Sequence, residues 1–228
     1  ALKFMDEHDK KYVPQVSQSV ASLLKEAEMV RATFKDSNDI RDIDQVMVAA
    51  KSYEKSFLDE FVVAFDNEQE VVKRLGAIGK QIGGQVTQLL QGQRNDYNDM
   101  VLAGIPSEML AGQVTDIFSG YEAIQSYVYG RLFMLYYIHT KNINHYETSL
   151  KYIKQCIQVT ESLKKTLQNP EHVNLADKML VNFDIYLKEA SSLKAAYSNM
   201  DAASESLVGY GTGVVYAANN ILSGQKDK

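Results

Sequence analysis

The chain has 228 residues, of which 45% are hydrophobic and 23% are charged, a composition that is typical of a folded globular protein and excludes a disordered one. Its net charge is −5 and it contains no block of basic residues, which argues against binding to a nucleic-acid backbone. Cys156 is the only cysteine, which excludes an internal disulfide, and no apolar run approaches the roughly 20 residues of a membrane-spanning helix.

The first part of the chain predicts two helices separated by a short turn. Apolar residues recur at three- and four-residue spacing over residues 2–34, the pattern of one buried helix face, and Pro14 indicates a late start or a kink. KDSND at 35–39 predicts the turn, and a second helix follows over 39–65. Candidates for the N-cap of this second helix are Ser37, Asn38 and Asp39.

The second predicted helix carries an aromatic stripe with charged residues beside it. We interpret the stripe as part of the core, because its members recur at four-residue spacing. Glu54 lies at the edge of this stripe, so we expect it to pair with Arg31 or Arg74 across the bundle and to fix the register of the helices. The stripe consists of Tyr53, Phe57 and Phe61.

Asp66 and Asn67 predict a turn, after which a third helix runs over 68–103. The second and third helices would then form an antiparallel hairpin. Glycine lowers helix propensity, so glycines inside the third helix suggest that a neighbouring helix approaches closely. These glycines are Gly76, Gly79, Gly83 and Gly84.

Stop and start signals divide the rest of the chain. The residues at 104–107 are expected to end one helix, with Ser107 as the N-cap of the next. A turn is expected at 140–144, and Asn169-Pro170 is expected to end the helix before it. The two helices around 140–144 form a second hairpin that is rich in aromatic residues before its turn, as the first hairpin is. An internal duplication and a chance likeness of helical hairpins both stay open. The predicted helices cover 107–139, 143–168 and 171–223.

The chain is therefore predicted to be all-α, with about six helices. The last of them exceeds fifty residues, or about 80 Å at the α-helical rise, which is too long for one compact bundle of the shorter helices. We expect an elongated molecule of two stacked four-helix bundles that share this long C-terminal helix. One bundle would comprise about 1–92 and 196–228, and the other about 93–195.

The sequence shows no pattern of catalytic or metal-ligating residues. None of the four histidines has an acidic residue three positions before it, which argues against a di-iron carboxylate bundle. GYGTGVV at 209–215 is not preceded by a strand or followed by Lys-Ser/Thr, so it predicts close helix packing and not a phosphate loop. We expect no enzyme, no bound metal and no cofactor.

Tyrosine is the unusual component, with 14 Tyr and no Trp. A buried tyrosine needs a partner for its hydroxyl, so a Tyr-rich bundle either has polar internal contacts or encloses a polar ligand. Arginine is scarce, and an arginine on a helix face can hold a carboxylate by paired hydrogen bonds. The candidate ligand-binding residues are Arg31, Arg74, Arg94, Tyr121, Tyr127, Arg131 and Tyr186.

One local segment points to a family. YEKSFL at 53–58 follows AAK at 49–51 and resembles the Ala-Arg-x-x-Glu-Lys-x-Phe-Leu-like segment on the second helix of the helical bimodular sensor domains of bacterial chemoreceptors and sensor histidine kinases. The spacing of Met200, Leu207 and Gly211 is similar to that of sensor helices that descend to the membrane. The resemblance in helix number, length and order extends over nearly the whole chain.

This resemblance implies a periplasmic or extracellular sensor domain of an inner-membrane protein that acts in chemotaxis or other signal transduction, such as a methyl-accepting chemotaxis protein. The bundle of 1–92 and 196–228 would lie near the membrane, and the membrane spans would lie outside this segment, which we expect to be part of a longer receptor. A homodimer formed through the first and last helices is expected, and signals would pass as a small shift of the first or last helix. The first expected partner is a small-molecule ligand, and a periplasmic binding protein is the second.

The ligand class is narrowed by departures from the family pattern. KKYVPQVSQS at 10–19 contains no Arg, whereas the organic-acid sensors of the family use arginines early in the first helix, and Lys51 stands where the motif prefers Arg. We therefore expect a monocarboxylate, an amine, an amino acid or an aromatic compound before a dicarboxylate. A structural or toxin-like helical bundle is the alternative to a receptor.

Overall fold

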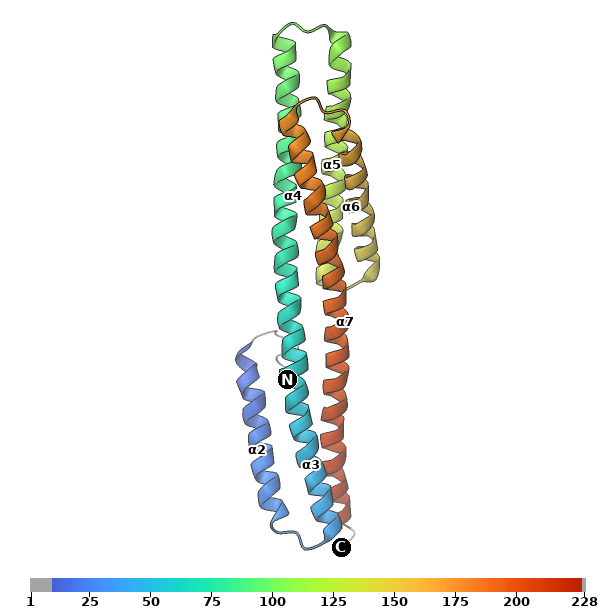
Figure 1. Cartoon of the computed structure of the whole chain (residues 1–228). Coiled ribbons are helices and arrows are strands. Elements are labelled where there is room, and N and C mark those ends of the chain that lie inside the picture. The colour runs from blue at the N-terminus through green and yellow to red at the C-terminus, as the bar shows by residue number, and fades with distance from the viewer. Residues whose placement is uncertain (1–9, 227–228) are drawn as a thin grey trace. The chain divides into compact units, whose positions relative to one another are not determined.

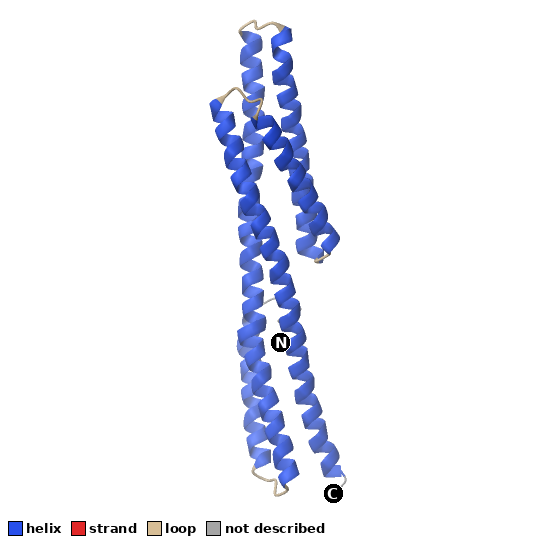
Figure 2. Ribbon diagram, turned by 45° about the vertical axis from the view of Figure 1, so that its right-hand side comes forward, coloured by secondary structure: helices blue, strands red, loops and turns tan. Residues whose placement is uncertain are grey.

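The computed structural model describes residues 10–226, and every regular element in this part of the chain is helical (Figure 2). The prediction of an all-α fold is thus confirmed. The helical stretches are short η1 (Lys10–Tyr12) and α2 (Val13–Arg31), then α3 (Ser37–Lys55), η2 (Ser56–Val62) and α4 (Val63–Leu102), then α5 (Ser107–Thr140), α6 (Ile143–Lys164) and α7 (Pro170–Lys226) (Figure 1).

The helix from Ser37 to Leu102 is continuous, so the turn predicted at Asp66 and Asn67 is wrong. Asp and Asn cost a helix less than about 1 kcal/mol each, which tertiary packing overrides. The join between α3 and α4 is η2, a seven-residue π-helix, which loosens the helical turn without breaking the chain. Asp66 lies just after it and forms an ion pair of 2.7 Å with Lys10. The first antiparallel hairpin and the internal duplication based on it are therefore wrong as well.

The N-cap positions of two helices lie one residue before the predicted ones. Asp36, and not Ser37, Asn38 or Asp39, caps α3, because its side chain accepts a 2.8 Å hydrogen bond from the backbone N–H of Asn38. Ser107 is the first residue of α5, and Pro106 occupies the cap position without a side-chain hydrogen bond. Sequence signals located these ends to within one residue.

Other helix ends follow the predicted signals. Pro14 lies in the first turn of α2, where its missing N–H leaves no helical bond unmade, so the late start is confirmed. Gly104 adopts a left-handed φ of 72° after α4, a conformation that favours glycine. The Asn169 side chain accepts a 3.0 Å hydrogen bond from the N–H of Glu171 and so starts α7. The predicted residues 2–9 of the first helix lie outside the described part.

α7 is one unbroken helix of 57 residues. This confirms that the last helix exceeds fifty residues. Its N-terminal end is set by Pro170, whose fixed φ suits the first position of a helix. The helix is therefore long enough to contribute side chains to more than one core.

The chain divides into two compact units, and α4 and α7 each contribute residues to both. Within the described residues, unit 1 consists of 10–69 and 195–226, and unit 2 of 70–194. We expected two stacked bundles with boundaries at 92–93 and 195–196. This division stays a prediction, because compactness alone does not define a bundle.

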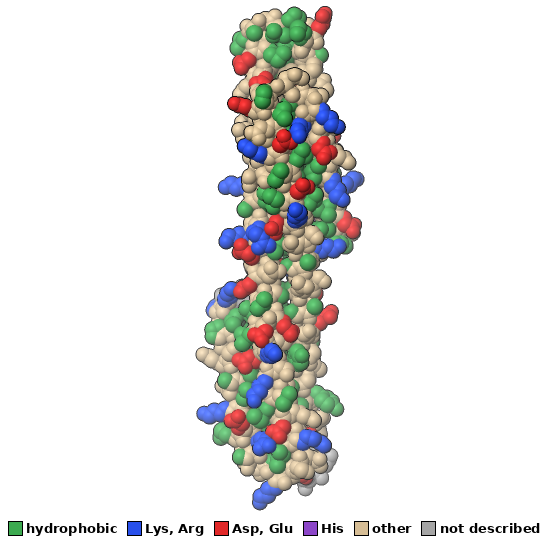
Figure 3. Space-filling model, in the orientation of Figure 1, with side chains coloured by type: hydrophobic (Ala, Val, Ile, Leu, Met, Phe, Trp, Pro, Cys, Tyr) green, Lys and Arg blue, Asp and Glu red, His purple; other side chains and the backbone are tan. Residues whose placement is uncertain are grey.

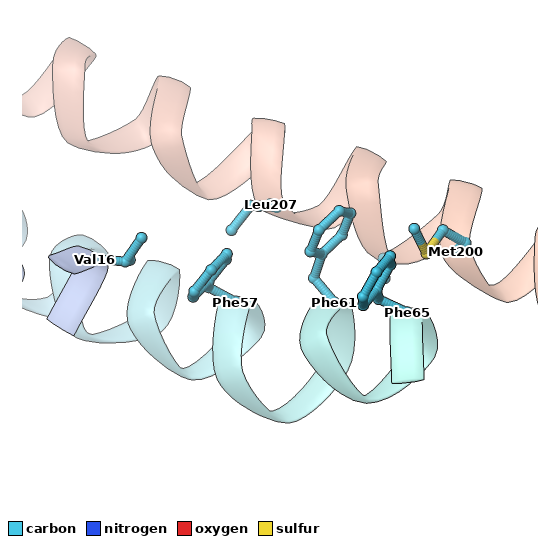
Figure 4. Packing of buried hydrophobic residues seen from close by; sticks show 7 residues of the cluster. Val16, Phe57, Phe61, Phe65, Met200 and Leu207 are labelled. Carbon is cyan, nitrogen blue, oxygen red and sulfur yellow. The ribbon is translucent and has the colours of Figure 1, made fainter. Parts of the chain in front are cut away.

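Unit 1 has a core of aromatic and aliphatic side chains between η2 and α7 (Figure 4). Phe57 and Phe61 are buried and stack with their ring centroids 6.2 Å apart, which confirms that they belong to the core, and Tyr53 packs at its edge. Burial of each Phe contributes about 1.5–3 kcal/mol. The cluster is Val16, Phe57, Phe61, Phe65, Met200, Ala203 and Leu207.

Unit 2 packs the C-terminal part of α4, the hairpin of α5 and α6, and the first part of α7 side by side (Figures 1 and 2). The predicted close approach at glycines is observed at Gly79 and Gly83, where side chains of α5 lie against the α4 backbone. At Gly76 and Gly84 a Cβ added to the backbone would meet open space, so the prediction is wrong there.

On the face shown in Figure 3, Lys and Arg side chains are interspersed with Asp and Glu over both units. None of the helices in residues 10–226 is both long and apolar enough to cross a membrane.

Candidate functional site

Three of the predicted site residues meet inside unit 2. Tyr127 and Arg131 lie one turn apart on α5, and Tyr186 faces them from α7. We call these three residues, together with Ser149 of α6, the tyrosine–arginine cluster. Its members come from three helices, and the two residues of α5 contact the backbone of α4.

The backbone of α4 holds two of these side chains. The Tyr127 hydroxyl donates a short hydrogen bond to the carbonyl oxygen of Gly79, and the Arg131 guanidinium donates to the carbonyl oxygen of Leu75 over 3.3 Å. Gly79 makes this approach possible, because a Cβ at that position would collide with the guanidinium of Arg131. The sequence thus places glycine where two long polar side chains cross a helix.

The other two side chains are fully buried. Ser149 donates a 2.7 Å hydrogen bond to the carbonyl oxygen of Gly130, whereas the Tyr186 hydroxyl has no hydrogen-bond partner within the described part of the chain. Burial raises the pKa of Tyr186, although Arg131 and Ser149 lie close enough to favour its ionised form. Burial also raises the pKa of Tyr127, to about 12. Both phenols are therefore neutral at physiological pH.

The tyrosine–arginine cluster is chemically suited to an anion, because it offers a guanidinium and hydroxyl donors. Its strongest donors are already bound to backbone carbonyls of α4. A carboxylate that accepts from the Tyr127 hydroxyl would have to displace its bond to Gly79, whereas Arg131 uses only one of its five N–H donors for Leu75. The observed bonds give the cluster the role of a polar contact between helices. Whether any of its residues binds a ligand stays a prediction.

The remaining candidates lie apart from this cluster. Arg31 of unit 1 is bound by both oxygens of Asp44, at 2.6 and 3.2 Å, and Arg74 of unit 2 donates to both oxygens of Glu189 at 3.1 Å. The paired carboxylate raises the pKa of each arginine. Arg94 and Tyr121 are exposed on α4 and α5. The candidates are thus distributed over both units.

The expected pairing of Glu54 with Arg31 or Arg74 is wrong, because each arginine is bound by a different acid. Asp44 lies on α3, the helix that follows Arg31 across one turn, and this short connection makes the pair easy to close. Arg74 belongs to unit 2 and Glu54 to unit 1. Helical periodicity correctly predicted that Glu54 is half-buried at the edge of its helix, but it gives no information on which residue pairs with Glu54.

Unit 2 also contains an open pocket that is lined by polar side chains. It has a volume of about 760 Å³ and lies where the C-terminal part of α4, the start of α5 and the α6–α7 connection meet. We call it the acidic pocket. Its lining is Asp96, Asp99, Met100, Met109, Gly112, Gln113, Thr115, Asp116, Thr166, Leu167, Gln168, Asn169 and His172.

Two carboxylates from different helices define the chemistry of the acidic pocket. Asp116 of α5 is buried and accepts a 2.6 Å hydrogen bond from the hydroxyl of Thr166. Asp96 of α4 is partly exposed, accepts a 3.1 Å hydrogen bond from the Asn169 amide, and lies 3.3 Å from Nδ1 of His172. Because a carboxylate has about four acceptor positions, both groups keep capacity for a further donor.

The wall beside the acidic pocket contains a second polar residue without a partner. The Gln93 side chain is fully buried, and neither its amide nitrogen nor its oxygen has a hydrogen-bond partner within residues 10–226. The backbone carbonyl of Gln93 accepts a 3.1 Å hydrogen bond from the pocket residue Gln113. A buried amide without hydrogen-bond partners costs roughly 1–3 kcal/mol. The Gln93 amide therefore destabilises this end of unit 2.

His172 is held at the first turn of α7 by close packing. Its imidazole lies against Gly92 of α4, where a Cβ would collide with the ring. His172 also lines a second, amide-rich groove of about 660 Å³ between α4 and α7. The imidazole thus forms the partition between the acidic pocket and this groove.

The acidic pocket was not predicted from the sequence. Asp96, Asp116 and His172 are separated by 20 and by 56 positions and belong to three helical segments, so no local motif joins them. One signal was present: Asp116 precedes Gly120 and Ala123 by four and seven residues, which places a carboxylate on the inward face of α5. A charged residue on an apolar face is a reason to look for a polar site.

No protein-family model matches the chain, and no curated protein matches it significantly.

Proposed function

We propose that this chain is a ligand-binding domain that holds a small organic cation, with a primary or secondary ammonium group, in the acidic pocket of unit 2. The observation that carries the proposal is the convergence of Asp96 and Asp116 from two helices on one open cavity. An ammonium donates two or three hydrogen bonds and is stabilised by carboxylates that are partly removed from water. Met100, Met109 and Leu167 offer apolar surface for the hydrocarbon part of such a ligand.

An amine is one of the ligand classes that the sequence left open, and the geometry favours it over a carboxylate. A carboxylate in the acidic pocket would face the like charges of Asp96, Asp99 and Asp116, which disfavours binding. In the tyrosine–arginine cluster, a carboxylate would compete with the bonds that Arg131 and Tyr127 make to α4. The proposal therefore places ligand binding in the acidic pocket and a structural role in the cluster.

The proposed role is that of an extracytoplasmic sensor domain of a chemoreceptor or histidine kinase, on the resemblance of YEKSFL at 53–58 to helical bimodular sensors. In this proposal units 1 and 2 are two bundles stacked lengthwise that share α7. Asn169 and His172 touch both the acidic pocket and the start of α7. A ligand that draws these residues inward would shift α7 along its neighbours, a movement that packed helices allow.

The proposal is tested by thermal unfolding of the purified chain with a panel of amines, amino acids and carboxylates. A bound amine at 100 times its Kd should stabilise the fold by about 2.7 kcal/mol and raise Tm by roughly 5–10 °C. Titration calorimetry then measures Kd for the variant Asp116→Asn, which should weaken binding at least tenfold. Asp184→Asn removes an exposed acid of α7 outside the pocket and should leave Kd unchanged.

The outcome also separates the alternatives. Stabilisation by carboxylates but not by amines would contradict the acidic-pocket proposal and favour the tyrosine–arginine cluster. If no small molecule raises Tm, the remaining proposals are a sensor that reads a periplasmic partner protein and a structural helical bundle.

A further inference from the structure

α5 is apolar on two opposite faces. Its inward face supplies Gly120, Ala123, Tyr127 and Met134 to the core of unit 2. A helix with a single core-facing stripe would carry polar residues on the opposite side. On α5 that opposite side is also mainly hydrophobic, so its outer face needs an explanation of its own.

The outer face follows a strict seven-residue repeat. Positions alternate at spacings of three and four over four heptads, the pattern of a coiled-coil seam. Phe118, Val128 and Leu135 are 68%, 53% and 51% exposed, so the seam is not covered by unit 2. No Asp, Glu, Lys or Arg occupies any of its positions. We call this row the α5 seam: Ala111, Val114, Phe118, Tyr121, Gln125, Val128, Leu132, Leu135 and His139.

We propose that the α5 seam packs against the same seam of a second copy of this chain, in parallel orientation about a two-fold axis. A two-fold interface requires a surface that is complementary to itself, and a heptad seam meets this requirement because its knobs fit the holes of an identical helix. The proposal does not depend on the proposed ligand.

The exposed area of the seam together with its flanking tyrosines reaches the lower end of the range for a specific dimer. The large side chains at the seam and beside it are between 38% and 68% exposed. If the accessible area of each free side chain is about 150–200 Å², these side chains expose roughly 600 Å² per chain. Complete burial of this area on two chains would remove about 1,200 Å² from water, which is the lower bound for stable interfaces. These side chains are Phe118, Tyr121, Val128, Tyr129, Leu132, Leu135 and Tyr136.

Gln125 favours the parallel orientation. It is the one amide in the apolar middle of the seam and is exposed on the unpaired chain. In a parallel pair the two Gln125 side chains face each other and can exchange hydrogen bonds, as a polar residue at a core position does when it fixes register. In an antiparallel pair each amide would face Val128 and lose its partners, which is costly when water is excluded.

The dimer is tested by light scattering after size exclusion and by sedimentation equilibrium of the whole chain. Val128→Glu and Leu135→Glu place a charge in the seam and should raise the dimer Kd at least tenfold each, while the melting curve of the monomer should change little because about half of each side chain is exposed. Val181→Glu is the matched control, since Val181 is 60% exposed on α7 and outside the seam.

Orientation is tested by single cysteine variants, because the native Cys156 is buried and will not compete. In a parallel dimer, Phe118→Cys and Leu135→Cys chains should each form a disulfide with a chain of the same kind. Cross-linking only between the two kinds of chain would overturn the parallel arrangement. A chain that is monomeric at every concentration, or a dimer that tolerates both Glu variants, would overturn the proposal.

Discussion

Two tyrosine hydroxyls in the same cluster have different energetic roles. Tyr127 donates its hydrogen to the Gly79 carbonyl, whereas Tyr186 has its hydroxyl buried without a partner among the described residues. A hydrogen bond that is made contributes about 1 kcal/mol, and a polar group that is buried and left unpaired costs about 1–3 kcal/mol. The same chemical group therefore stabilises unit 2 at one position and destabilises it at the other.

Removing each hydroxyl should separate these roles. We expect Tyr127→Phe to lower the free energy of unfolding by about 1 kcal/mol, because the hydrogen bond to α4 is lost. Tyr186→Phe should leave it unchanged or raise it by up to about 1 kcal/mol, because an unpartnered hydroxyl is removed without a change in ring packing. Urea denaturation followed by circular dichroism measures both. Equal losses for the two variants would show that Tyr186 has a bound partner, such as a water molecule.

The ionisation of Tyr127 predicts how stability changes at high pH. Its pKa is about 12 in the folded chain and 10 when exposed, so the contribution of the neutral phenol is complete below pH 10 and is lost as pH rises toward 12. At pH 11 this loss should be about 1.4 kcal/mol. The difference in unfolding free energy between pH 9 and pH 11 should therefore be smaller for Tyr127→Phe than for the unchanged chain.

The control for this pH effect is Tyr216→Phe, since Tyr216 is an exposed tyrosine of α7 outside the α5 seam. If Tyr127→Phe and Tyr216→Phe alter the pH dependence equally, burial of the Tyr127 phenol is not the cause.

At the scale of one element, close helix packing depends on single glycines. Gly130 of α5 faces α6, and a Cβ added there would lie 2.7 Å from the side chain and 3.3 Å from the backbone nitrogen of Ile153. Backbone cannot move aside as the end of a flexible side chain can. Gly76 of α4 has open space at the same position, so it costs the helix propensity without a packing benefit.

The two glycines should respond in opposite directions to the same change. Gly130→Ala is expected to destabilise the chain by about 1–3 kcal/mol through overpacking between α5 and α6. Gly76→Ala is expected to stabilise it by about 0.5–1 kcal/mol, because alanine is the better helix former. Chemical denaturation of the two variants provides the comparison. A loss of stability in Gly76→Ala would mean that the helix has a close neighbour there.

At the scale of the whole molecule, the chain has two cores, and two helices, α4 and α7, contribute to both. The core of unit 1 contains Phe61, while unit 2 has its own buried residues on α4, α5, α6 and α7. Separate cores allow separate cooperative units of unfolding. The length of α7 does not by itself require the two units to unfold together.

Phe61→Ala should act mainly on unit 1. We expect a local loss of about 3–5 kcal/mol, because a buried aromatic side chain leaves a cavity. Hydrogen exchange followed by mass spectrometry should show faster exchange over residues 37–69 and 195–226 and little change in α6. Equal acceleration in α6 would show that the two units unfold as one.

Much of the helical framework is determined by local sequence. The ends of α5, α6 and α7 follow from Gly104, the turn around Lys141 and Asn169-Pro170, because caps and backbone conformations act over a few residues. The unbroken length of α7 follows from the absence of prolines after Pro170. The inward direction of Tyr127 follows from helical periodicity.

The tertiary structure decided what local signals could not. Asp66 and Asn67 favour a turn locally, but packing of the neighbouring core and the π-helical join keep the helix continuous. Asp96, Asp116 and His172 form one pocket only because three helical segments end in the same region. Caps and periodicity are set within a few residues of chain, whereas a pocket depends on contacts between distant segments, and one sequence read alone does not specify those contacts.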